Sequence, residues 1–94
     1  MKTITSKELN TLTGAIKHVG NYHVQNQYIL TFETGTGLQS YDSLIVVQVY
    51  GNTYIGENWN YSRTTSKYRS LFLNETTKET ETKINNGTYI MIQD

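Results

Sequence analysis

Four hydroxyl side chains lie close together between residues 62 and 66, beside two basic and two aromatic side chains. The segment consists of Trp59, Tyr61, Ser62, Arg63, Thr64, Thr65, Ser66 and Lys67. A helix that begins here would leave its first backbone N–H groups unpaired, and these groups, the helix dipole and the hydroxyls together favour an anion. The segment therefore predicts a binding site for a phosphate, a nucleotide or a carboxylate of a partner protein.

The same residues also have an ordinary structural interpretation. In that interpretation one hydroxyl caps the helix, the two aromatic rings belong to the core, and the two basic side chains are solvated. Four hydroxyls are more than one cap needs, which keeps the binding interpretation open. Arg69 lies about 200° around the helix from Lys67, so it does not extend the basic face.

No combination of residues predicts a catalytic centre, and the protein is not expected to be an enzyme. Cysteine is absent, and no serine stands in a Gly-x-Ser-x-Gly elbow. No spacing brings two of the carboxylates Asp42, Glu57 and Glu75 together. His18 and His23 are the only histidines, and they would bind a metal only with carboxylates from elsewhere, so no metal and no cofactor are predicted.

Tyrosine supplies eight of the aromatic residues and suggests an interaction surface. Tyr22, Tyr50 and Tyr54 are the candidates for exposure, and an exposed tyrosine offers a large contact area with little loss of rotamer entropy. The Asp42-Ser43 pair suits a turn in which the Asp side chain bonds to the backbone. A tyrosine-rich face or a free sheet edge could equally join two copies into a homodimer.

Length and charge narrow the remaining function classes. The chain has 94 residues, which predicts one domain, and its formal net charge is zero. A neutral chain argues against a DNA-coating protein and leaves nucleic-acid binding to a local basic patch. The start of the chain carries no secretory stretch, and no run approaches the ~18 apolar residues of a membrane span. These features predict a cytoplasmic protein that does not contact the membrane.

Residues 1–21 predict an N-terminal helical segment. Ser6 can cap a helix whose apolar residues recur at helical spacing, namely Leu9, Leu12, Ile16 and Val19. Gly14 and its neighbouring threonines favour a second interpretation. In it the helix ends near Thr13, and residues 15–19 form a loop or a strand.

Residues 22–56 predict a β-meander. The alternating side chains of residues 28–33 are typical of a strand, and Gly35-Thr36-Gly37 predicts the turn that follows it. Residues 44–50 are apolar on both faces at their start, which predicts a central strand covered on both sides. Gly51-Asn52 then predicts a tight hairpin turn.

Residues 59–86 predict two short helices, and residues 88–93 predict the last strand. Thr76 and Glu79 form a capping-box pattern at the start of the second helix, where a Glu79–Lys83 pair adds support. This helix is so polar that only Ile84 clearly anchors it. The elements together predict one α+β domain, with an antiparallel sheet of about four to five strands and two to three short helices packed on one face.

Three stretches form a pattern: residues 40–46 read SYDSLIV, residues 59–68 read WNYSRTTSKY, and residues 72–73 read FL. The pattern resembles a family of small uncharacterised proteins from phages and mobile elements of low-GC Gram-positive bacteria. The shared core of that family reads roughly S-Y-x-T/S-x-I-A, then W-D-Y-S-x-T-T-S-K-Y/H, then F-L. Asn60 and Val46 depart from it, since Asp and Ala are common there. The family has no assigned activity, so the resemblance implies a shared fold and a genomic setting.

The leading hypothesis from the sequence is a non-enzymatic phage or mobile-element protein that binds a host protein. The resemblance suggests an anti-defence role, for example inhibition of a CRISPR effector. Two alternatives stay open: a protein that binds or sequesters a nucleotide or another small anion, and an accessory nucleic-acid-binding protein.

Overall fold

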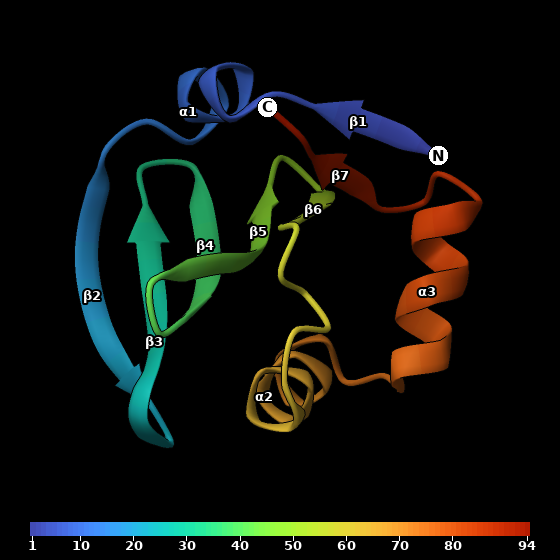
Figure 1. The fold of residues 1–94 in the computed structure, drawn as a ribbon. Coiled ribbons are helices and arrows are strands. Elements are labelled where there is room, and N and C mark those ends of the chain that lie inside the picture. The colour runs from blue at the N-terminus through green and yellow to red at the C-terminus, as the bar shows by residue number, and fades with distance from the viewer.

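Seven strands form one mixed sheet, in the order β1-β7-β6-β5-β4-β3-β2 (Figure 1). A computed structural model describes residues 1–94, with the elements β1 (Lys2–Ile4), α1 (Ser6–Thr13), β2 (Ile16–Tyr22), β3 (Val24–Phe32), β4 (Gly35–Ser40), β5 (Ser43–Val49), β6 (Asn52–Ile55), α2 (Arg63–Leu73), α3 (Thr77–Asn85) and β7 (Ile90–Ile92). The α+β class is confirmed. The expectation of four to five antiparallel strands is wrong, because the sheet is larger and two of its pairs are parallel.

The parallel pairs arise at the two ends of the chain. Strands β2 to β6 form an antiparallel meander, and the chain then runs through α2 and α3 before β7 pairs in parallel with β6. A helical connection of this kind returns the chain to the same end of the sheet, which is what a parallel neighbour requires. The three-residue strand β1 then adds to the free side of β7. Three residues carry no usable periodicity, so the sequence did not predict β1.

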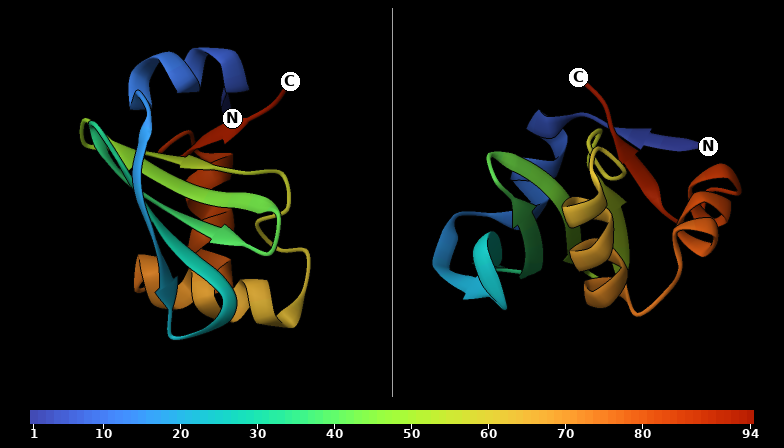
Figure 2. Two further views of the ribbon diagram at one scale, coloured as in Figure 1. Left: turned by 90° about the vertical axis from the view of Figure 1, so that its left-hand side faces the viewer. Right: turned by 60° about the horizontal axis from the view of Figure 1, so that its bottom comes forward.

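Apolar side chains cover both faces of the sheet, so the prediction that the helices pack on one face is corrected. On one face, α1 packs through Leu9 and Leu12. On the other face, α2 and α3 pack through Phe72, Leu73 and Ile84. Helix α1 therefore lies on the opposite side of the meander from α2 and α3 (Figures 1 and 2). The prediction of a central strand covered on both sides is confirmed for β5. Its side chains divide between the two faces, Val47 and Val49 with α1, and Ile45 and Val46 with α2 and α3.

The helical segment expected over residues 1–21 is shorter than predicted, and the second interpretation of this region describes it better. Helix α1 ends at Thr13, and residues 16–22 form β2. The cap is Thr5 rather than Ser6: the Thr5 side chain accepts from the Glu8 N–H, and the Glu8 side chain accepts from the Thr5 N–H. Pairing with β3 decides the outcome, because it gives β2 a ladder of hydrogen bonds that outweighs its helical spacing.

Two turn predictions shift along the chain. Gly35-Thr36-Gly37 belongs to β4 instead of a turn. Gly35 lies so close to β5 that an added Cβ would come within 2.0 Å of the Gln48 carbonyl oxygen, so glycine serves close approach here. The hairpin after β5 turns at Tyr50 and Gly51, both with positive φ, one residue earlier than predicted.

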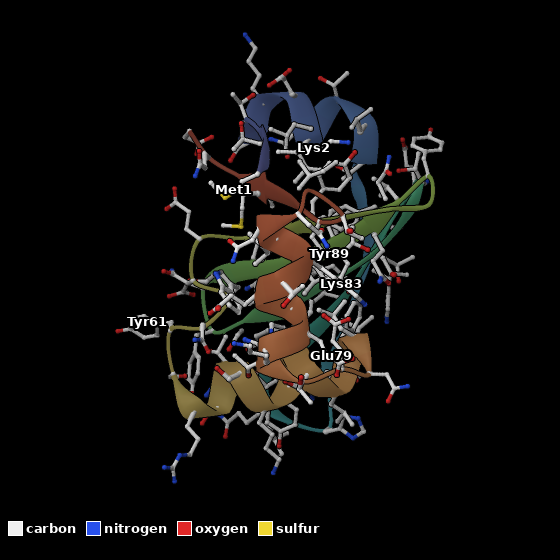
Figure 3. The ribbon with its side chains drawn as sticks, turned by 90° about the vertical axis from the view of Figure 1, so that its right-hand side faces the viewer. Met1, Lys2, Tyr61, Glu79, Lys83 and Tyr89 are labelled. Atoms are coloured by element: carbon white, nitrogen blue, oxygen red, sulfur yellow. The ribbon has the colours of Figure 1, made fainter.

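Helix α3 is held by a polar cluster that its sequence did not reveal. The Thr76–Glu79 capping box and the anchor Ile84 are confirmed. The Lys83 ammonium pairs with Glu75 at 2.7 Å rather than with Glu79. Glu75 also accepts hydrogen bonds from Tyr89 Oη at 2.7 Å and from Thr80 Oγ1 at 2.6 Å. In Figure 3, Lys83 and Tyr89 lie next to each other beside α3.

Tyr89 is expected to make the fold sensitive to alkaline pH. Burial, and then the hydrogen bond to Glu75, raise the pKa of the Tyr89 hydroxyl from 10.0 to about 12. Stability from a raised pKa is complete below the unfolded value and is lost as the pH rises through the folded value. Two pKa units correspond to about 2.7 kcal/mol, so we expect wild type to lose about 2 kcal/mol more than Tyr89→Phe between pH ~10 and ~12.

Urea unfolding of both proteins along that pH range measures the difference. Lys83 titrates in the same direction, chiefly because its bond to Glu75 raises its pKa, and that bond is present in both proteins. Tyr89 adds a smaller increase to the Lys83 pKa, so the measured difference includes this coupling. Parallel stability curves for the two proteins would show that Tyr89 contributes nothing to the alkaline limb.

Candidate functional site

The segment from Gly56 to Ser62 carries the chain from β6 to α2 through tight turns. The N–H of Trp59 donates to the Gly56 carbonyl at 3.1 Å, and the N–H of Tyr61 donates to the Asn58 carbonyl at 3.1 Å. These turns place Trp59 against the core under α2 and α3. They direct Tyr61 away from the ribbon, where 79% of its surface is exposed (Figure 3).

Arg69 fixes the conformation of this segment from inside. Its side chain is fully buried and lies over the Trp59 ring, with 5.0 Å between the guanidinium carbon and the ring centroid. Nη1 donates to the Trp59 carbonyl at 2.6 Å, and Nη2 donates to Thr77 Oγ1 at 2.6 Å. The sequence correctly separated Arg69 from the Lys67 face, but it gave no sign that Arg69 joins the loop to α3.

The hydroxyl groups of the predicted anion site are mostly used within the chain. Ser62 caps α2: its Oγ accepts from the Thr65 N–H at 3.1 Å and donates to Thr65 Oγ1 at 3.1 Å. Ser66 Oγ donates to Asn60 Oδ1 at 2.6 Å. Thr65 is buried, and the Thr64 side chain is exposed. The arrangement favours the structural interpretation of these hydroxyls over an anion site.

The predicted basic and imidazole groups lie at the surface and do not meet. Arg63 and Lys67 are exposed, and the Lys67 ammonium lies 5.4 Å from the centroid of the Tyr68 ring. His18 is exposed on β2, and His23 is exposed in the turn before β3, 4.4 Å from the Tyr22 ring centroid. No group of three or more His, Asp or Glu side chains is arranged to hold a metal ion.

A cavity of about 300 Å³ opens beside the first turn of α2. We call it the tyrosine pocket, and its lining residues are Ser40, Tyr41, Asp42, Ser43, Ile45, Asn58, Tyr61 and Thr65. Of the predicted site residues, only Tyr61 and Thr65 line it. Asn58 comes from the loop before α2, and the other lining residues come from β4, β5 and the turn between them. Four of these belong to the SYDS stretch of the sequence pattern. The SYDS stretch was the sequence signal that could have indicated this pocket. It was not predicted as a site, because a turn already explained its residues.

The turn between β4 and β5 holds Tyr41 rigidly at the rim of the pocket. Tyr41 has a φ of 53°, which places a bulky residue in the left-handed region at a cost of roughly 1–2 kcal/mol. Its N–H donates to the Asn26 carbonyl at 2.7 Å, and its carbonyl accepts from Gln39 Nε2 at 2.7 Å. These bonds replace the predicted Asp42 side-chain turn. They leave 51% of the Tyr41 surface exposed.

Of the three tyrosines predicted to be exposed, one is. Tyr50 is 71% exposed at the hairpin after β5, at the opposite end of that strand from Tyr41. Tyr22 is partly buried beneath α2, and Tyr54 is buried in the cluster under α1. Tyr54 lies on an interior strand, where its ring fills the core.

A chain of buried polar groups reaches one wall of the pocket, which Ser40 and Thr65 line. Gln27 Nε2 donates to Ser40 Oγ at 2.9 Å, and Ser40 Oγ lies 2.9 Å from Thr65 Oγ1. Ser62 already donates to Thr65, so the Ser40–Thr65 contact needs one hydroxyl proton and two are present. One hydroxyl proton in the wall is therefore free to donate. Turning the Gln27 amide over would move the surplus donor onto Gln27 itself.

A second cavity of about 180 Å³ adjoins the tyrosine pocket. The two share Ser43 and Asn58, whose side chains are joined by a 2.9 Å hydrogen bond. The lining of the second cavity consists of Ser6, Ser43, Leu44, Gly56, Glu57, Asn58, Ile92 and Asp94. Bonds from the backbone N–H and then the hydroxyl of Ser6 lower the pKa of the Asp94 carboxyl. Neither cavity is lined by Lys, Arg or His.

A sequence model described as "Family of unknown function (DUF8033)" matches residues 2–87 of the chain. No curated protein and no solved structure matches it. None of the three helices is long and apolar enough to cross a membrane.

Proposed function

Because the chain belongs to a family of unknown function, DUF8033, we propose its role from its surface: it binds a partner protein through the tyrosine pocket. One observation carries the proposal, which is that two exposed tyrosines, Tyr41 and Tyr61, border the same cavity on rigid supports. Tyrosine is enriched among the residues that dominate interface energies. The resemblance to phage and mobile-element proteins makes a host defence protein the first partner class to test.

A fixed backbone matters because ordering mobile contact residues lowers the conformational entropy and weakens binding. The backbone of Tyr41 is held through its N–H by Asn26 and through its carbonyl by the Gln39 side chain. The backbone of Tyr61 is held through its N–H by Asn58, two residues after the Trp59 carbonyl that Arg69 binds. With the backbone fixed, a tyrosine has only two side-chain torsions to order, so it loses little conformational freedom on binding. The pocket that both tyrosines line gives a partner side chain a place to be desolvated, as interface anchors require.

The lining of the pocket supports a nucleotide or small anion less well. Asp42 is the one ionisable carboxylate in the lining, and no basic side chain lines it to neutralise a phosphate. Ser62, the residue best placed to bind an anion at the start of α2, is already used as its cap. Zero net charge likewise gives a nucleic-acid partner little electrostatic attraction.

Site-directed photo-crosslinking tests the proposal. A benzophenone amino acid is placed at residue 61 or, as the matched control, at residue 50. The natural residue at position 50 is also an exposed tyrosine, and it lies in the turn after β5. In lysate of a low-GC Gram-positive host, we expect residue 61 to capture one partner that residue 50 does not. Unlabelled wild type should compete for that partner, and Tyr61→Ala should compete at least tenfold less well. Equal capture from both positions, or none from residue 61, would refute the proposal.

A further inference from the structure

We propose that the partner presents a basic side chain, arginine or lysine, which enters the tyrosine pocket and meets Asp42 between Tyr41 and Tyr61. The inference rests on the proposed function and adds the chemistry of the recognised group. Asp42 takes part in no ion pair, since the two ion pairs of the molecule are Lys17–Glu33 and Lys83–Glu75. Its carboxylate is available to a cation from outside.

Aromatic rings and a carboxylate around one cavity form a setting that suits a cation. A guanidinium or ammonium group is attracted to the face of a tyrosine ring and forms short, charge-assisted hydrogen bonds with a carboxylate. Both kinds of group line the tyrosine pocket. The cavity measures about 300 Å³, at the lower end of the range for ligand pockets, which suits an extended side chain better than a nucleotide.

The buried wall supplies the complementary group for the partner's backbone. Ser40 and Thr65 are 2% and 3% exposed. With Gln27 donating to Ser40 and Ser62 donating to Thr65, one of their two hydroxyl protons is left without an acceptor. A main-chain carbonyl that enters with the basic side chain would accept this proton. The same wall would gain nothing from a second ammonium group, so it favours a peptide segment over a free amine.

The adjoining cavity extends the same charge preference. Glu57 and Asp94 line it, neither is in an ion pair, and it meets the tyrosine pocket at Ser43 and Asn58. The exposed bases of α2, Arg63 and Lys67, line neither cavity. A partner segment with two neighbouring basic residues is therefore expected to bind better than a segment with one.

Peptide titration followed by amide NMR shifts tests the inference. The probes are acetylated, amidated Gly-Arg-Gly-Arg-Gly and two controls in which glutamate or norleucine replaces arginine. We expect the arginine peptide alone to shift Tyr41, Asp42, Ser43 and Asn58. Asp42→Asn should weaken its binding about tenfold, whereas the matched exposed variant Glu81→Gln should not. Both substitutions remove one surface carboxylate and keep side-chain size.

The outcomes distinguish the recognition of a basic group from the proposed binding of a partner protein. If residue 61 captures a partner but Asp42→Asn binds that partner as wild type does, the basic-group inference is overturned and the partner-binding function remains. If the glutamate or norleucine peptide shifts the same residues, or Glu81→Gln weakens binding as much as Asp42→Asn, recognition is unspecific and the inference fails. If the arginine peptide shifts none of the four residues, it fails as well.

Discussion

Replacing Arg69 with alanine is expected to lower the free energy of unfolding by about 3 kcal/mol, which corresponds to a fall in Tm of roughly 15 °C. The substitution leaves the Trp59 carbonyl and the Thr77 hydroxyl without their partner and empties a fully buried site. Arg69 has no carboxylate within ion-pairing distance. Burial lowers the pKa of its guanidinium and Glu75 partly offsets this, so the wild type already bears part of the cost of an enclosed charge.

Arg69→Met is the informative control, because it keeps most of the volume and removes the charge together with its bonds. Replacing a buried charge with an apolar residue of similar size is often nearly neutral. We therefore expect Arg69→Met to lose about 1 kcal/mol, between wild type and Arg69→Ala. Urea unfolding at neutral pH gives both values. A loss below 1 kcal/mol for Arg69→Ala would mean that the loop and α3 are held by other contacts.

Replacing Glu75 with alanine is the second large change, with an expected loss of about 3 kcal/mol. The Glu75 side chain is 4% exposed and accepts from Lys83, Tyr89 and Thr80. Lys83 is 39% exposed and can return to water, so most of the loss comes from the buried hydroxyls of Tyr89 and Thr80. Glu75→Gln keeps an acceptor for these donors and is expected to lose about half as much.

The Glu75 effect is also expected to depend on acid pH. Burial alone would raise the pKa of this carboxyl, but the hydrogen bonds from Lys83, Thr80 and Tyr89 outweigh it and hold the pKa below 4.5. Stability from a lowered pKa is complete above the unfolded value and is lost as the pH falls through the folded value. Unfolding measured from neutral pH downwards should thus bring wild type closer to Glu75→Gln below pH ~4.5.

Subtracting the two curves removes the acidic groups that Glu75 does not influence. Glu8 and Asp94 have pKa values lowered by hydrogen bonds to backbone N–H groups, and Glu75 is not among the causes, so they cancel. The pKa of Glu79 is lowered in the same way and is raised slightly by Glu75, so the difference includes this weak coupling. A constant difference between wild type and Glu75→Gln down to low pH would show that the charge of Glu75 does not stabilise the fold.

Local patterns predicted those parts of the fold that depend on neighbours in the sequence. The Thr76–Glu79 box, the strand at β5 and the anchor Ile84 were all found in this way. Local patterns failed where a distant strand decided the outcome. Residues 16–22 have helical spacing and form β2, and Gly35 is in β4 because the Gln48 carbonyl lies too close for a side chain.

The candidate site, like the fold, has a part that local sequence indicated and a part that depends on distant segments. The segment from Trp59 to Lys67 was predicted as a site by composition, yet most of its hydroxyls serve the chain itself. The tyrosine pocket combines Tyr61 with Tyr41 and Asp42. Tyr61 is separated from the other two by about twenty residues, and they line one pocket only because β4 and α2 pack together. No periodicity or local spacing records that contact.

The sequence by itself determined the α+β class, the Thr76–Glu79 capping box and the lack of cysteine chemistry, because each depends on residue type or short-range spacing. Tertiary structure alone decided the parallel additions at β7 and β1, the burial of Arg69 and Glu75, and the shape of the tyrosine pocket. These features depend on which distant backbone groups come close enough to bond, and on how much water their packing excludes.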